Sequence, residues 1–194
     1  MRSTILGFFS IALLSSAAIA GDVGSGASLG SVRYDWNRDG FIDRAEIFQE
    51  SNDDSVQLHV RFGRRGGGLS PPIIAKGFAG STPTIGDPAH IKLNALGSIV
   101  VESSHIGVGR GKYEASTIVA FREGHMRVIG YEISNWDSLD PKAATRCDVN
   151  FLNGRANIVR AGESVVRTIR HRNTPIRIVD WAMLPEFTGT CPAS

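Results

Sequence analysis

Apolar and polar residues alternate along much of the chain beyond residue 54, and this pattern predicts β-strands. In the run 55–62 (Ser-Val-Gln-Leu-His-Val-Arg-Phe) the alternation is unbroken, which indicates a strand with one buried face. Turn-forming residues at 51–54 precede it, so we expect a hairpin over 45–62. Shorter apolar runs predict further strands at 91–102 (one or two strands), 113–121, 126–133, 147–152, 156–159, 164–170 and 176–181.

Turn signals between these runs favour antiparallel pairing. Arg122–His125 predicts a tight turn, and Asn153-Gly154 is a strong hairpin signal. Gly- and Pro-rich residues 71–88 are expected to form an irregular connector, because Pro71 and Pro72 cannot donate to a ladder. Helical periodicity never lasts more than about two turns outside the N-terminal segment. The predicted fold class is therefore mostly β, with antiparallel sheets or hairpins and little helix.

The N-terminal segment has the features of a secretory signal peptide. Arg2 gives a positive start, Ile5–Leu14 is largely apolar, and Ala18-Ile19-Ala20 offers a cleavage site. An uncleaved anchor is the alternative, but the apolar run is shorter than the ~20 residues that span a bilayer. We expect residues 1–20 to be removed, residues 21–32 to form a flexible lead-in, and the mature chain to be periplasmic or secreted without a transmembrane segment.

The overall charge of the chain limits the classes of binding partner that are expected. The 194 residues include 21 Lys and Arg against 19 Asp and Glu, so bulk charge favours neither nucleic acid nor strong membrane adhesion. Arginines gather in 155–177, which admits an anionic envelope polymer or a protein as partner, or simply a solvated strand face. Trp136, Trp181 and Tyr131 are candidates for a sugar-binding surface or for the core.

Two cysteines, Cys147 and Cys191, are compatible with one disulfide. An even number of cysteines in an exported chain favours pairing. The alternative is two free thiols. Neither cysteine belongs to a C-x-x-C pair, so no redox activity is expected.

Residues 35–46 carry the spacing of a calcium-binding loop. Side-chain oxygens fall at positions 1, 3, 5 and 9, a glycine at position 6, a backbone carbonyl at position 7 and a glutamate at position 12. These residues are, in order, Asp35, Asn37, Asp39, Asp43, Gly40, Phe41 and Glu46. Ile42 at position 8 is expected to anchor the loop to the core.

The charge of this loop is the physical reason to expect a cation. Two carboxylates at 4–5 Å repel each other by about 4 kcal/mol at an effective dielectric near 20. Calcium prefers six to eight oxygens of this kind, whereas magnesium prefers a tighter octahedron with several waters. An ion-free Asp/Asn/Gly-rich turn is the alternative.

The loop resembles one FG-GAP/VCBS-type repeat. The resemblance covers about residues 33–68 and includes the loop, a strand, an Asn/Asp turn, a second strand and Phe62-Gly63. It implies Asp35, Asn37, Asp39, Asp43 and the Phe41 carbonyl as calcium ligands, whereas Glu46 would fall in a strand. The D-x-N-x-D-G spacing is also EF-hand-like, but the residues before Asp35 make a poor helix. A closed propeller is not expected, because the loop occurs once.

These observations predict an exported calcium-binding β protein, a structural or binding module of the cell envelope. Residues 33–68 would form a calcium-loop hairpin, compact with an antiparallel β domain over 90–191. No catalytic signature is present, and the five histidines show no metal-binding spacing, so we expect no enzyme activity. The alternatives are a hydrolase-like envelope enzyme with a site beyond residue 90, and a helix–loop–helix calcium regulator.

Overall fold

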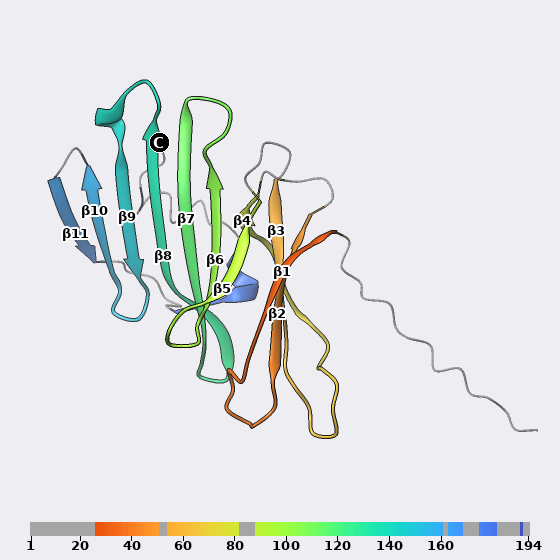
Figure 1. Cartoon of the computed structure of the whole chain (residues 1–194). Helices are drawn as coiled ribbons and strands as arrows, with labels where there is room; N and C mark the ends of the chain where they lie inside the picture. Colours follow the sequence, from red (N-terminus) through yellow and green to blue (C-terminus); the bar gives the residue numbers. More distant parts are fainter. Residues whose placement is uncertain are drawn as a thin grey trace, which may run out of the picture.

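Two antiparallel sheets form the fold in the computed structural model (Figure 1). The structure describes residues 26–50, 54–81, 88–160, 163–168, 175–181 and 191. The predicted signal peptide and its cleavage site lie outside these residues. The mostly-β prediction is confirmed, because every helix in the described residues is a single 3-10 turn.

The small sheet has the order β1-β2-β3-β4. Its strands are β1 (Ser28–Tyr34), β2 (Asp43–Gln49), β3 (Ser55–Arg61) and β4 (Ile73–Gly80). The expected hairpin over 45–62 is confirmed as the β2–β3 pair, whose register places Ala45 opposite Val60 and Ile47 opposite Leu58. All four of these side chains are buried, so alternation assigned the core face correctly.

Two segments of the small sheet differ from the expectation. Residues 28–32 were expected in a flexible lead-in but belong to β1, where Leu29 and Val32 pack on the core. The connector predicted for 71–88 was wrong over residues 73–80, which form β4. Pro71 and Pro72 precede the strand, and β4 is an edge strand whose pairing shifts register between Val56 and Leu58. The prolines therefore set where the ladder begins.

The large sheet has the order β11-β10-β9-β8-β7-β6-β5, and the two-residue β12 also pairs with β8. Its strands are β5 (His90–Leu93), β6 (Ile99–His105), β7 (Gly111–Arg122), β8 (His125–Asp137), β9 (Thr145–Asn150), β10 (Arg155–Arg160), β11 (Glu163–Thr168) and β12 (Ile176–Arg177). The hairpins expected around 122–125 and Asn153-Gly154 are confirmed. The run 91–102 contains parts of two strands.

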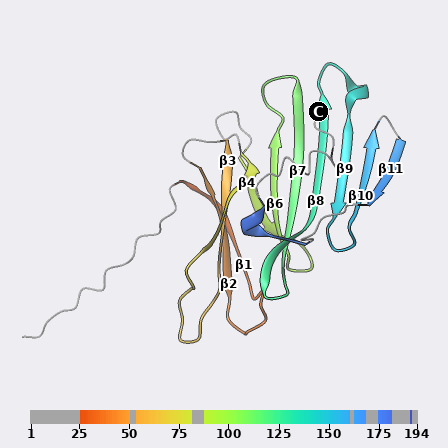
Figure 2. The ribbon, with the colours of Figure 1, turned by 180° about the vertical axis from the view of Figure 1, so that it is seen from behind.

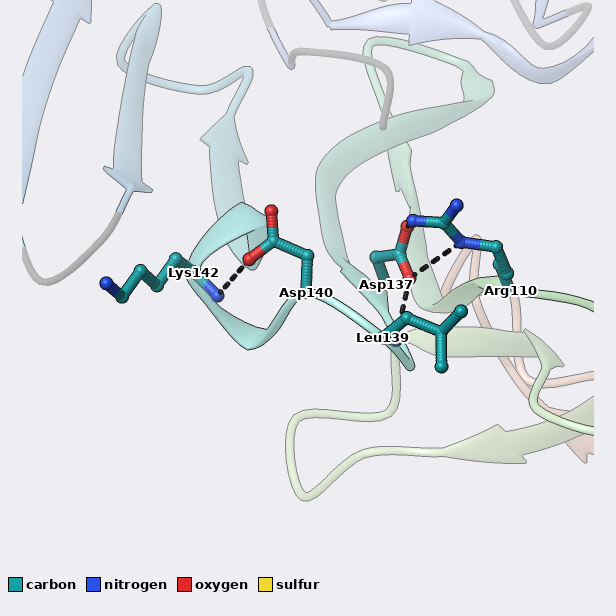
Figure 3. A network of polar contacts seen from close by, with 5 residues as sticks. All are labelled: Arg110, Asp137, Leu139, Asp140 and Lys142. Atoms are coloured by element: carbon teal, nitrogen blue, oxygen red, sulfur yellow. Dashed lines mark hydrogen bonds and ion pairs between the residues drawn. The ribbon is translucent and has the colours of Figure 1, made fainter.

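Two segments of the large sheet differ in extent from the prediction. The strand predicted at 126–133 is longer, because β8 continues to Asp137, and η2 (Pro141–Ala143) follows, capped by the Asp140 side chain. The strand expected at 176–181 is β12 followed by η3 (Ile178–Asp180). Arg110, from the β6–β7 loop, donates two hydrogen bonds to Asp137, from Nε at 3.2 Å and from Nη2 at 2.7 Å (Figure 3).

One hydrophobic cluster joins the inner faces of both sheets. β1 lies against β5, where Gly30 leaves room for the Ile91 side chain. η3 lies between the sheets in both ribbon views and contacts β4 and β8 (Figure 2). The adjacent Trp181 is buried, donates from Nε1 to the Phe78 carbonyl at 3.1 Å, and packs on Tyr131 and Phe151.

The predicted disulfide is confirmed. Cys147 of β9 is bonded to Cys191, with Cα atoms 5.5 Å apart, and both residues are buried. The bond ties the C-terminal segment to the large sheet. Within the described part of the chain, no helix has the length and apolar character needed to span a membrane.

Candidate functional site

The predicted calcium loop connects β1 to β2 at one end of the small sheet, the lower end in Figure 1. Two residues in it have positive φ: Arg38 at 59° and Gly40 at 87°. Gly40 adopts this conformation at no steric cost, whereas Arg38 must be held there by its surroundings. These two residues turn the chain sharply between Asp35 and Phe41.

Three of the predicted ligands accept hydrogen bonds from the amides of residues 39–41. The Asp39 amide donates to both Asp35 Oδ1 and Asn37 Oδ1, each at 3.1 Å. The Gly40 amide donates to Asp35 Oδ2 at 2.9 Å, and the Phe41 amide to Asp39 Oδ1 at 2.9 Å. Asn37 Nδ2 donates to Asp39 Oδ2 at 2.8 Å. The oxygens of Asp35, Asn37 and Asp39 therefore converge on one turn.

Asp43 lies inside the protein and ties the end of the loop to its neighbours. It is fully buried, accepts from the Trp36 amide at 2.8 Å through Oδ2, and accepts from the Gly63 amide at 2.9 Å through Oδ1. A Cβ at Gly63 would lie 2.7 Å from the Ile42 carbonyl oxygen, so only glycine allows this approach. Asp43 thus fixes the loop to the β3–β4 connection.

The anchor of the loop is Trp36, which the sequence pattern did not single out. Trp36 is 7% exposed, and its Nε1 donates to the Gly97 carbonyl at 2.9 Å. Ile42, expected as the anchor, is 59% exposed, so that prediction was wrong. Asp43 takes the inward position one residue later, and the alternation of β2 leaves Ile42 outside.

Glu46 is not brought to the loop. It lies on the face of β2 opposite to Asp43, pairs with Arg44 at 2.9 Å and accepts from Ser28 Oγ at 2.7 Å. Because side chains alternate between the two faces of a strand, the residue at position 12 points to the opposite face of the sheet from the residue at position 9. A helix after the loop would be required to return Glu46 to the other ligands.

The described residues contain no group of three or more histidine, cysteine, aspartate or glutamate side chains arranged to hold a metal ion. The loop oxygens comprise two carboxylates outside the core, one amide oxygen and one buried carboxylate. Each carboxylate oxygen has two lone-pair directions, and one amide N–H occupies only one of them. The arrangement leaves acceptor capacity on Asp35 and Asp39.

Two hollows lie on the outer face of the large sheet, formed mainly by residues beyond 90. The first, of about 480 Å³, is lined by polar side chains from four strands, including His90, Glu102, Glu114 and Glu132. Glu102 pairs with Lys92 at 2.6 Å and Glu132 with Arg146 at 2.5 Å. The second, of about 780 Å³, shares Ser134 with the first and contains Trp136, Lys142 and Arg146.

The remaining candidate residues are divided between core and surface. Trp181 and Tyr131 pack in the core, whereas Trp136 is half-buried at the second hollow. Arg155, Arg160 and Arg177 are exposed. The side chains of Arg167, Arg170 and Arg172 lie outside the described set.

The surroundings of Tyr131 and Asp137 shift the pKa values of these two side chains. Burial raises the pKa of Tyr131 to about 12, with a smaller contribution from Tyr113. The hydrogen bond from Arg110 lowers the pKa of Asp137, and the Leu139 amide lowers it further. Neither group lies in the loop.

Comparison with known proteins gives no assignment. The chain matches no protein family model, no curated protein and no solved structure. The class of the protein is therefore defined by its fold, a mostly-β chain of two antiparallel sheets with one disulfide.

Proposed function

We propose that this protein is an exported β module of the cell envelope whose loop 35–43 binds one calcium ion. Asp35, Asn37 and Asp39 supply side-chain oxygens, and the Phe41 carbonyl supplies a neutral one. Asp43 anchors the loop and completes the acidic set, whereas Glu46 is left out because it faces the other side of β2.

The observation that supports this best is the convergence of Asp35 and Asn37 on the Asp39 amide. An amide N–H is a weak positive partner compared with a divalent cation. The side chains of Asp35 and Asp39 keep two negative charges on one turn, outside the core. A hard cation that prefers oxygen ligands neutralises them more completely than the loop amides do.

The ion would stabilise the open end of the small sheet. Few carboxylates are available, and calcium affinity falls as the number of charged ligands falls, so we expect a dissociation constant of about 0.1–1 mM, as in extracellular calcium modules. Calcium at about thirty times that value would stabilise the fold by about 2 kcal/mol. The melting temperature should then rise by about 4–8 °C.

The test is thermal unfolding and calorimetric titration of the chain from Gly21, with calcium or with EDTA. The double variant Asp35→Asn, Asp39→Asn should lose both the heat of binding and the rise in melting temperature. Asparagine keeps one of the two accepting oxygens at each position and nearly the same side-chain shape, so the double variant removes the charge with the least change to the turn.

A matched control is the double variant Asp148→Asn, Asp180→Asn, which removes two exposed charges far from the loop in sequence. It should retain the full calcium effect. An equal calcium shift in the two double variants would contradict the proposal, as would the absence of any heat at millimolar calcium.

A second candidate is a hydrolase-like activity at the first hollow of the large sheet. The observation that favours it is the presence of His90 and three glutamates around one cavity. Carboxylates in one cleft serve as general acid and base in hydrolysis. The test is hydrolysis of envelope polysaccharide fragments by the wild type and by Glu114→Gln. Equal rates would reject it, whatever the calcium result.

A further inference from the structure

Three arginines stand side by side on the outer face of the small sheet. In the register of the strands, Arg33 of β1 lies opposite Arg44 of β2, which lies opposite Arg61 of β3. Directly opposed residues have Cβ atoms about 5 Å apart, and like charges there destabilise a sheet. Arg44 pairs with Glu46, whereas Arg33 is exposed and forms no ion pair with any described residue. This row therefore carries excess positive charge.

The adjoining loops add charge at the same end of the molecule. Arg38 lies in the loop after β1, and Arg64 and Arg65 lie in the loop after β3; all three are exposed. Both loops are at the lower end in Figure 1. We call the six residues Arg33, Arg38, Arg44, Arg61, Arg64 and Arg65 the arginine cluster. Loop 35–43 and β2 contribute four carboxylates, Asp35, Asp39, Asp43 and Glu46, so these ten residues together carry two more positive than negative charges.

Exposed apolar side chains accompany the arginine cluster. Ile42 is 59% exposed and Leu96, in the β5–β6 turn, is 86% exposed. Tyr34, 43% exposed, lies against Gly97, where an added Cβ would be 2.5 Å from the ring. That contact and the Trp36–Gly97 hydrogen bond place the Leu96 turn beside the loop. Apolar side chains next to cations suit a lipid interface better than a fully hydrated polyanion.

We propose that this end of the molecule docks on the surface of an anionic phospholipid bilayer. The arginine cluster would contact phosphate groups, which guanidinium groups bind in a bidentate manner. Ile42 and Leu96 would enter the headgroup region. Overall charge is nearly balanced, so the attraction arises from the local separation of charge on this sheet.

Calcium bound to the loop would strengthen the docking, and this part of the proposal rests on the proposed function. A bound ion would raise the excess positive charge of these ten residues from two to four. The docking itself requires only the arginines and the apolar side chains, so the two ideas fail separately.

The test is sedimentation of the chain from Gly21 with vesicles of phosphatidylcholine, with or without about a third of phosphatidylglycerol, in EDTA. We expect binding only to the anionic vesicles. Arg64→Gln, Arg65→Gln should weaken it about 25-fold, from about fivefold per arginine. The matched control Lys142→Gln, Arg160→Gln, which changes two exposed cations near the start of β9, should bind as the wild type does.

Two further arms separate the lipid from other sources of negative charge and from calcium. Leu96→Ser should weaken vesicle binding but not binding to polygalacturonate; unchanged vesicle binding by Leu96→Ser would overturn the lipid assignment in favour of an acidic polymer. Equal losses of vesicle binding in the Arg64/Arg65 and Lys142/Arg160 double variants would overturn docking altogether. So would the absence of binding to anionic vesicles.

Adding calcium should tighten vesicle binding of the wild type more than that of Asp35→Asn, Asp39→Asn. An equal increase in vesicle binding by the wild type and this variant would reject the contribution of loop-bound calcium. The docking proposal itself would stand.

Discussion

The small and large sheets differ in what holds their ends in place. In the small sheet, the β1–β2 loop is held by hydrogen bonds from the Trp36 and Gly63 amides to the buried Asp43. In the large sheet, Cys147 is bonded covalently to Cys191, and Trp181 is buried against Tyr131 and Phe151. The first end depends largely on polar contacts to a carboxylate, and the proposed calcium site lies there. The second depends on a covalent bond and apolar burial, neither of which requires a bound ion.

Removing the disulfide should have the largest effect. The double variant Cys147→Ala, Cys191→Ala opens a link between residues 44 apart in sequence, and the chain-entropy model gives a loss of about 4 kcal/mol. Urea denaturation followed by tryptophan fluorescence measures it. If the two ends are independent, any calcium response of the loop survives in this variant. A loss below about 1 kcal/mol would mean that the bond between Cys147 and Cys191 contributes little to the stability of the large sheet.

Asp43→Ala should have the next largest effect, about 3 kcal/mol, because it leaves two buried amide donors without an acceptor. Asp43→Asn keeps one side-chain oxygen and should lose about half as much. Denaturant unfolding compares both with Asp148→Ala, an exposed change on the large sheet that should stay within about 0.5 kcal/mol. Similar stability of all three variants would show that the Asp43 bonds do not hold the loop.

The smallest effect concerns the large sheet at alkaline pH. Burial raises the pKa of Tyr131 to about 12, whereas an unfolded tyrosine titrates near 10. The neutral phenol is favoured in the fold, so its contribution is complete below pH 10 and is lost as pH rises toward 12. The loss amounts to about 1.4 kcal/mol at pH 11 and about 2 kcal/mol at pH 12.

Unfolding free energies measured from pH 9 to 12 test this, with Tyr131→Phe and the exposed Tyr34→Phe side by side. Tyr131→Phe should remove that part of the alkaline decline, and Tyr34→Phe should not. The same slope in the two variants would place the alkaline sensitivity elsewhere than at Tyr131.

Much of the fold could be predicted because local patterns and tertiary structure agree there. Alternation in 55–62 identified β3 and its buried face, and Asn153-Gly154 identified the β9–β10 hairpin. β4 was missed because Pro71, Pro72 and the nearby glycines are typical of turns. Residues 73–80 nevertheless form an edge strand, which pairs with β3 only. β1 was missed because its inward residues, such as Leu29 and Val32, are few and acquire a role only when the core forms.

The candidate loop was predictable in its residues but not in its contacts. Spacing located Asp35, Asn37, Asp39 and Asp43, and turn chemistry located Gly40. The anchoring role of Trp36 was not predictable, because its hydrogen-bond partner, Gly97, lies 61 residues away in sequence. Glu46 matched position 12, yet the period of a strand carries it to the opposite face from Asp43.

The sequence by itself determined the class of the fold, the strands with regular alternation and the grouping of oxygen-bearing residues around one glycine. These features depend on neighbours within a few positions along the chain. Tertiary structure alone decided which loop residue is buried, that Trp181 packs on Tyr131 and Phe151, and that Arg33, Arg44 and Arg61 form one row. Strand register and sheet packing bring together residues distant in sequence, and no local pattern records those distances.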